Sequence, residues 1–478
     1  MRDQHHWSLR WAAEILVVLL LLVGGLTYRF DLADRLLGPA ADPRTDPAAV
    51  AAPEGLVLPP ARTAPIVAKT GTSGQIDAQA VAAKLRPMLR RDPLGGHYSV
   101  LVSDLATGAP VFRAGARRVT PASTAKLLTS VAVLESLGPM ARFRTSVRFD
   151  PARGRLVLVG GGDPLLGSSP SAGNGSYPER ADLETLARQT VRQLRSQGVK
   201  RAKLVYDDTY FSGPAVNPHW PGSYVPEDVV PPIGALWVEE GRAGSYGFVA
   251  DPAQTAGDAF ADALRAAGLK VQGAAARASG PAIGTELTYV SSAPLGEIVE
   301  RTLALSDNEA AEVLARHVGL AQRQEGSFEA GSAAVLDVVA QLGVATAGDR
   351  LYDGSGLSRE DLLAPETLAG VLRVASSAEH PELRSAITGL PVAGFTGSLR
   401  ARFDSGPAAA LGRVRAKTGT LTGVHGLAGV ARDVSGGEMV FVVIADRVAV
   451  PKTLEARLLI DQIAAALGAC RCGVGSSP

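Results

Sequence analysis

The chain has 478 residues, of which 46% are hydrophobic and 20% charged, and its formal net charge is +1. This composition excludes a disordered chain and allows two or three folded domains. No basic cluster with interleaved aromatic residues occurs, so we expect no nucleic acid among the partners.

A basic start followed by an apolar run opens the sequence. Two arginines within the first ten residues precede "ILVVLLLLVGGL" at residues 15–26, which is the layout of a secretory signal. Counted from Trp11 to Tyr28, the stretch approaches the ~20 residues that span a bilayer. A cleaved signal and an uncleaved anchor therefore both remain open for residues 1–30. In either case we expect the body of the protein outside the cytoplasm, held at the membrane if the segment is kept.

Residues 31–76 are rich in Pro and Ala and lack periodicity, which is typical of a linker. A first copy of "AKTGT" lies in it at residues 68–72. No strand pattern precedes this copy, so it reads as a loop that leads into the helix expected from residue 77.

The body begins with this helix and continues with a β-hairpin at residues 97–118. "PASTAKLLTSVAVLESLG" at residues 121–138 then predicts a strong amphipathic helix. Strands and helices alternate further on, around a loop-rich section that runs to about Ala243. The last strands and the closing helix near the C-terminus, together with the early hairpin, suggest that both ends of the body build one sheet.

Two cysteines, Cys470 and Cys472, lie near the C-terminus with one residue between them. We expect no structural role for them, because they are too close for an ordinary disulfide and no other His or Cys has zinc-ligand spacing. Residues 469–478 are therefore expected to form a C-terminal tail.

Three short motifs stand out along the body. The first is Ser123-Thr124-Ala125-Lys126. Residues three apart share a helix face, so Ser123 and Lys126 can touch near a helix start, where the helix dipole favours developing negative charge. A Lys with a lowered pKa can then act as the base for the serine. We expect partial burial and the nearby charge of Lys417 to lower the pKa of Lys126. A capping Ser with an exposed Lys is the structural alternative, but no other Ser of the chain has a Lys three residues on.

The second motif is Ser306-Asp307-Asn308. Asn offers a donor and an acceptor that suit a peptide amide, and Ser can relay a proton to a leaving amine. A simple turn or helix cap would also explain this motif by itself.

The third motif is the second "AKTGT", with Lys417, Thr418, Gly419 and Thr420. It lies between β-forming runs, where a strand edge can offer backbone groups to an extended peptide. Lys417 supplies a positive charge and the threonines supply hydroxyls for a carboxylate, while Gly419 leaves room for close approach.

The three motifs in this order occur in penicillin-binding proteins and serine β-lactamases. With "LVLVGGGDPLL", "DDTYFSGP", "YDGSGLSR" and "GFTGSLRARF", the chain resembles the penicillin-binding protein 4-type D-alanyl-D-alanine carboxypeptidases, serine peptidase family S13. The resemblance runs from about Val81 to the C-terminal helix. It departs from the family at "PPIGALWVEEGRAG", residues 231–244, which leaves the substrate contacts there open.

The resemblance implies an α+β transpeptidase-like fold, in which an antiparallel sheet is flanked by helices. It implies a catalytic domain made of residues 77–145 and 288–468, with an inserted α/β domain at residues 146–287. It further implies no metal or cofactor.

The implied reaction is hydrolysis of the D-Ala-D-Ala end of peptidoglycan stem peptides through an acyl-enzyme on Ser123. Lys126 would take the serine proton and Ser306 would protonate the leaving amine. Asn308 would hold the peptide, and Lys417, Thr418, Gly419 and Thr420 would bind its carboxylate. The backbone N–H groups of Ser123 and Thr420 would form the oxyanion hole, and β-lactams would acylate Ser123. Trimming of the terminal residue and cleavage of cross-links both remain open.

Three other functions can be weighed against the sequence. A class A β-lactamase has a Glu four residues before an Asn, whereas Pro170, Gly213 and Ala304 occupy those positions before the three Asn of this chain. The second alternative is a non-catalytic scaffold of the cell wall, and the three intact motifs argue against it. A Ser-His-Asp hydrolase is weaker still, because no G-x-S-x-G occurs.

Overall fold

The computed structural model describes residues 75–90, 93–171, 177–280 and 283–473. The predicted signal or anchor segment, nearly all of the predicted linker and the first AKTGT copy lie outside these ranges. Within them, no helix is long and apolar enough to cross a membrane.

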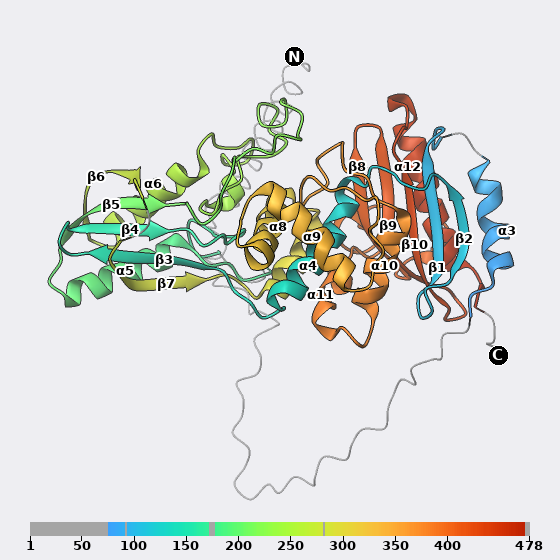
Figure 1. Ribbon diagram of the computed structural model, residues 1–478, viewed down its shortest axis with the longest axis horizontal. Coiled ribbons are helices and arrows are strands. Elements are labelled where there is room, and N and C mark those ends of the chain that lie inside the picture. Colours follow the sequence, from blue (N-terminus) through green and yellow to red (C-terminus); the bar gives the residue numbers. More distant parts are fainter. Residues whose placement is uncertain (1–74, 91–92, 172–176, 281–282, 474–478) are drawn as a thin grey trace, which may run out of the picture. The chain divides into compact units, whose positions relative to one another are not determined.

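The first sheet joins both ends of the body, as the sequence predicts (Figure 1). Its strands, in the order β2-β1-β10-β9-β8, are Pro110–Gly115, Tyr98–Asp104, Glu438–Ala445, Val424–Arg432 and Val414–Leu421. All neighbours are antiparallel, and β1 pairs with β10 over its whole length. The third motif therefore lies on β8, at one edge of this sheet.

Helices cover both faces of the sheet, which explains why β10 is apolar at nearly every position. Val440, Val442 and Ile444 pack with the helices that surround the first motif. Met439, Phe441 and Val443 alternate with them and pack with the C-terminal helix on the opposite face. The helices on this side of the molecule and around the first sheet are α3 Ala78–Leu89, α4 Lys126–Leu137, α7 Leu295–Leu305, α8 Asn308–Arg323, α9 Phe328–Gln341, α10 Pro365–Ser376, α11 Ser385–Thr388 and α12 Thr453–Ala469.

The segment predicted as an amphipathic helix is different in the structure. Residues Ala122–Ala125 form a 3₁₀ turn, and α4 follows from Lys126. Every residue from Lys126 to Leu134 is buried, because α4 packs against helices α8, α9 and α10 and belongs to the core cluster that one face of the sheet also lines. The predicted helix is thus present from Lys126 to Leu137, but the prediction that it is amphipathic was wrong, since α4 is the central helix of this core.

A second sheet lies between the first two motifs in the sequence. Its strands, in the order β6-β5-β4-β3-β7, are Lys270–Arg277, Arg201–Asp207, Arg155–Val159, Arg144–Asp150 and Thr285–Ser291. Strands β4, β5 and β6 are parallel and are joined through α5 Leu183–Ser196 and α6 Pro252–Ala266. This sheet extends a few residues beyond the predicted insertion at 146–287; the division into domains stays a prediction.

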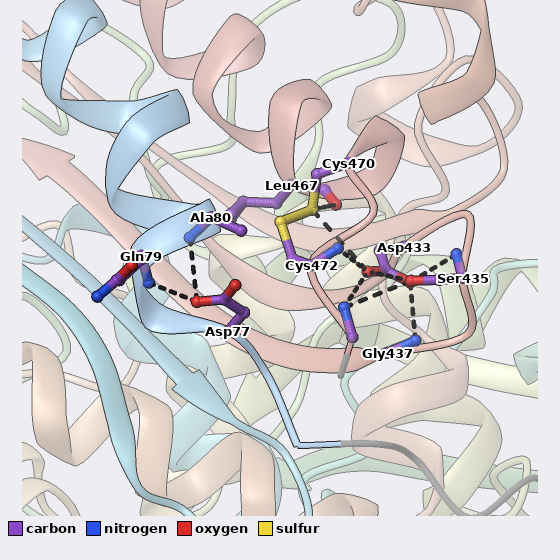
Figure 2. The surroundings of a disulfide bond; sticks show 10 residues. Asp77, Gln79, Ala80, Asp433, Ser435, Gly437, Leu467, Cys470 and Cys472 are labelled. Carbon is purple, nitrogen blue, oxygen red and sulfur yellow. Dashed lines mark hydrogen bonds between the residues drawn. A yellow bond between two sulfur atoms is a disulfide. The ribbon is translucent and has the colours of Figure 1, made fainter. Parts of the chain in front are cut away.

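The two cysteines correct another expectation (Figure 2). Cys470 and Cys472 are buried and form a disulfide, with Cα atoms 5.5 Å apart, a separation within the usual disulfide range. The carboxylate of Asp433 accepts hydrogen bonds from the N–H groups of Cys472, at 2.6 Å, and Gly473, at 2.9 Å. Residues 470–473 are therefore a packed part of the body, because their backbone donors have a buried carboxylate as partner.

The same C-terminal residues bind the start of the body. The N–H of Asp77 donates to the carbonyl of Cys472 at 2.6 Å, and Ile76 forms a bridge with Gly473. The side chain of Asp77 in turn caps α3, where it accepts from the N–H groups of Gln79 and Ala80. We call residues 76–77 and 470–473 the terminal clasp.

Candidate active site

The three motifs meet in one place, as their order in the sequence predicts. Ser123 is half-buried on the 3₁₀ turn before α4, and Lys126 is the fully buried first residue of that helix. Ser306 and Asn308 lie on either side of the short break between α7 and α8. Lys417 is fully buried on β8, which packs against the 3₁₀ turn.

The amine of Lys126 has three partners. Its Nζ is 3.1 Å from the Oγ of Ser123, 2.7 Å from the Oδ1 of Asn308 and 2.7 Å from the carbonyl oxygen of Ser355. The two carbonyl-type oxygens can only accept hydrogen bonds. A neutral amine with its two N–H groups on these acceptors keeps its lone pair for Ser123. The geometry therefore suits Lys126 as the base that takes the hydroxyl proton.

The backbone before Ser123 is constrained from two sides. Ala122 has a φ of 47°, an uncommon left-handed conformation for a residue with a Cβ. A Cβ on Gly356 would lie 2.0 Å from the Ala122 carbonyl oxygen, and one on Gly419 would lie 2.7 Å from that of Pro121. These two glycines allow a loop and β8 to close on the turn that presents the nucleophile.

The second motif combines a left-handed residue with a helix cap. Ser306 ends α7 with φ 59° and ψ 40°, and the Asp307 side chain caps α8 by accepting from the N–H of Ala310. The hydroxyl of Ser306 accepts a hydrogen bond of 2.7 Å from the Nζ of Lys417. The second motif thus contacts the first through Asn308 and the third through Ser306.

The third motif occupies the open part of an edge strand. Residues 391–393 pair with β8 only near Arg415 and Ala416, and among the described residues no strand pairs with this edge further on. Thr420 is exposed, whereas Thr418 is buried and its hydroxyl lies 3.0 Å from that of Ser398. The edge from Lys417 onward is therefore available to an extended peptide.

Burial controls the charges of the two lysines. Burial lowers the pKa of Lys126 to about 8, although the carboxylates of Asp353, Glu312, Asp307 and Glu309 raise it. The pKa of Lys417 is lowered well below its usual value, mainly by burial and also by the charge of Lys126.

Burial is the cause that lowers the pKa of Lys126, and the repulsion between the two ammonium groups appears in the lowered pKa of Lys417. Because two interacting groups titrate as a pair, the expected contribution of Lys417 to the lowered pKa of Lys126 stays a prediction.

Several residues of the site escaped sequence reasoning. Ser355 contributes only its carbonyl, which no side-chain pattern signals, although it lies in "YDGSGLSR". Ser398, beside Thr418, lies in "GFTGSLRARF". Both stretches belong to the family resemblance, which was the available signal, but nothing in their composition assigns them a contact.

The segment that departs from the family lies behind the second motif. Glu240 is buried and forms an ion pair with Arg301, with a Glu240 Oε1 to Arg301 Nη2 distance of 2.6 Å. Arg301 also pairs with Asp307. The carboxyl groups of Glu240, Asp307 and Glu309 lie within 4.8 Å of one another. Because Arg301 already provides the positive charge for them, we assign no metal to this cluster.

Comparison with known proteins agrees with this geometry. The family model described as the D-Ala-D-Ala carboxypeptidase 3 (S13) family matches residues 81–246 and 243–467. The chain is 35% identical to carboxypeptidase DacB of Mycolicibacterium smegmatis over 442 residues, which cover 91% of each chain. It is 30% identical to a D-alanyl-D-alanine carboxypeptidase of Actinomadura over 422 residues, which cover 70% of this chain and 75% of the relative. Among solved structures, penicillin binding protein 4 from Haemophilus influenzae matches with a TM-score of 0.64 and 21% identity, over 80% of this chain and 98% of that one.

Proposed function

Because the chain belongs to the D-Ala-D-Ala carboxypeptidase (S13) family, we propose that its three motifs hydrolyse the D-Ala-D-Ala end of peptidoglycan stem peptides through an acyl-enzyme on Ser123. The observation that carries this proposal is the contact of Lys126 with Ser123 and with two obligate acceptors. This arrangement supplies a nucleophile and a correctly oriented base within one turn of chain.

Acylation starts when the Ser123 oxygen attacks the carbonyl carbon of the penultimate D-Ala while its proton moves to the Lys126 amine. The bond from carbon to the terminal D-Ala nitrogen then breaks, and the leaving amine takes a proton from the Ser306 hydroxyl. Ser306 is suited to this step because Lys417 Nζ lies 2.7 Å from its oxygen, so a protonated Lys417 can resupply the proton. Water finally adds to the ester carbon; the Ser123 oxygen leaves and takes back the proton that Lys126 holds, and the shortened peptide departs with a new carboxyl group.

Substrate binding follows from the open edge of β8. A stem peptide that lies along this edge places its terminal carboxylate near Lys417, Thr418 and Thr420, with Gly419 leaving the room. Burial lowers the pKa of Lys417, and a carboxylate bound beside it would favour the protonated lysine and so raise this pKa. Asn308 would hold the peptide amide. The N–H groups of Ser123 and Thr420 would bind the oxyanion.

The proposal extends to inhibitors, to cross-links and to location. β-Lactams, which mimic the substrate, acylate Ser123, and the same site cleaves cross-linked peptides if the second chain fits beside β8. The apolar run at residues 15–26 supports a body outside the cytoplasm, anchored to the membrane or secreted after cleavage.

One experiment tests this function. The purified protein is incubated with a stem pentapeptide, with a cross-linked dimer and with penicillin, and the products and the intact protein are weighed by mass spectrometry. We expect loss of one alanine from the pentapeptide and a single penicillin adduct on Ser123, absent from Ser123→Ala. Products without alanine loss, or an equal adduct on the Ala variant, would refute it. Rapid release of hydrolysed penicillin would instead favour a β-lactamase, and no turnover with any substrate would favour a scaffold.

A further inference from the structure

A buried glutamate lies behind the base. Glu312 follows Asn308 by one turn on α8 and is fully buried. Its carboxylate accepts the N–H of Ser355 at 2.8 Å and the N–H of Gly354 at 3.1 Å. The carbonyl of Ser355 then accepts from Lys126 at 2.7 Å. Helix α8 therefore holds the base twice, directly through Asn308 and indirectly through Glu312.

The loop of residues 353–358, which carries this carbonyl, is held at its other positions by separate groups. Asp353 accepts the N–H groups of Gly356 and Ser358, both at 2.6 Å, and the indole N–H of Trp220 at 2.8 Å. Thr129 donates to the carbonyl of Gly354 at 2.7 Å. The N–H groups of Gly354 and Ser355 thus depend on Glu312, whereas Asp353 holds the N–H of Gly356 in the peptide unit that carries the Ser355 carbonyl.

The charges around Lys126 come from three directions. Helix α8 and its cap contribute Glu312, Glu309 and Asp307, and the loop contributes Asp353; each carboxylate raises the pKa of Lys126 against the effect of burial. Strand β8 contributes the amine of Lys417, whose own pKa is lowered well below its usual value.

The charges around Glu312 oppose each other. Burial and the neighbouring Asp353 raise its pKa to about 8, while its hydrogen bonds to the loop and the charge of Lys126 lower it. Arg316, one turn further along α8, is the other cation that interacts with it. Glu312 and Lys126 therefore titrate in the same range and respond to each other's charge.

We propose that Glu312 is a positioning residue for Lys126: through the N–H groups of Gly354 and Ser355 it holds in place the residue whose carbonyl accepts from the amine, and it places a negative charge behind the proton that the amine receives. This inference rests on the proposed function, in which Lys126 takes the proton of Ser123. Glu312 itself neither gives nor takes a proton in the step; the proton passes from Ser123 Oγ to Lys126 Nζ as the serine oxygen bonds to the substrate carbon.

Two substitutions distinguish the effect of the Glu312 charge from the effect of its side-chain length. Glu312→Gln keeps the length but removes the charge, and its single carbonyl oxygen can no longer give one acceptor oxygen to each amide. Glu312→Asp keeps the charge but shortens the side chain. The matched control is Glu329→Gln, which removes an exposed carboxylate from α9.

The measurement is the rate constant for acylation of the purified full chain by a chromogenic β-lactam, across the neutral and alkaline range. In Glu312→Gln the pH at which the rate is half-maximal should fall by about half a unit or more, because a charge that favours protonated Lys126 is gone. The plateau should fall about tenfold in both Glu312 variants, because a buried N–H loses its acceptor. In Glu312→Asp the midpoint should stay near that of wild type, and Glu329→Gln should match wild type in both respects.

The outcomes discriminate between the two proposals. A wild-type chain that no β-lactam acylates refutes the proposed function, and this inference with it. If the wild type is acylated with a clear midpoint, and the midpoint of Glu312→Gln is unchanged or higher, only the role of Glu312 is refuted. If Glu312→Gln does not fold, Glu312→Asp decides, since a plateau equal to wild type contradicts the positioning role.

Discussion

Asn308 Oδ1 lies 2.7 Å from Lys126 Nζ, so the second motif holds the base of the first. The proposed substrate contact of Asn308 is therefore only part of its task. Because this acceptor helps to direct the amine lone pair, we expect Asn308→Ala to lower the acylation rate constant about 10²-fold. Stopped-flow acylation by a chromogenic β-lactam measures it. An Asn308→Ala variant that loses peptide hydrolysis but is acylated at the wild-type rate would show that the contact with Lys126 does not matter.

The pH dependence of acylation follows from the buried amine. Only the neutral form of Lys126 can take a proton, and its pKa is about 8. The rate should therefore rise with pH through this value and level off above it. Lys126→Arg should be inactive, because a guanidinium stays protonated throughout this range. The acylation rate constant measured across pH checks both points. A midpoint near that of a free lysine, or an active Arg variant, would exclude Lys126 as the base.

The two AKTGT copies provide a built-in comparison. Lys417 lies in the site and contacts Ser306, whereas Lys69 lies in the predicted linker. We expect Lys417→Ala to lower acylation at least 10²-fold, because the carboxylate loses its charge partner, and Lys69→Ala to leave it unchanged. If the charge of Lys417 also lowers the pKa of Lys126, the midpoint of the pH profile should rise in Lys417→Ala. An equal loss of acylation in Lys417→Ala and Lys69→Ala would overturn our choice of copy, and an unchanged midpoint would leave burial as the cause of the lowered pKa.

Gly419 tests the closeness of β8 to the nucleophile. An added Cβ would lie 2.7 Å from the Pro121 carbonyl oxygen, so Gly419→Ala must push the strand and the 3₁₀ turn apart. We expect acylation to fall 10- to 100-fold, since a displacement of about 1 Å has such an effect on positioned groups. Gly96→Ala, where an added Cβ has nothing within 4 Å, is the control. Equal acylation rates in Gly419→Ala and Gly96→Ala would show that the 3₁₀ turn can shift to accept the added Cβ without slowing acylation.

The sequence predicts what depends on the type and spacing of side chains. Ser123, Lys126, Ser306 and Lys417 were found because each needs a particular functional group at a particular interval. The first sheet was predicted because clear turn residues separate its β-forming segments. The contribution of Ser355 could not be found in this way, since it consists of a backbone carbonyl aimed by a distant carboxylate.

Other errors came from judging local sequence without its surroundings. Helix α4 has Lys126, Thr129 and Ser130 among its buried residues, and these polar positions made it resemble an amphipathic helix. The carbonyls of Ser355 and Gly354, which accept from Lys126 and Thr129, come from a loop more than 200 residues away. The cysteine pair was misjudged likewise, because the partner of its backbone, Asp433, lies on another segment.

The terminal clasp makes the described body nearly a closed ring. Ile76 bridges Gly473, and Asp77 donates to Cys472, so a short connection could join the two ends and a new start could be cut at an exposed loop. The order in which the three motifs occur along the chain would then change, while β1 and β10 would still pair and Ser123 would keep its neighbours. The order of the three motifs along the chain therefore depends on where the chain begins and ends. The site itself requires only that all the elements of the body are present and pair as they do here.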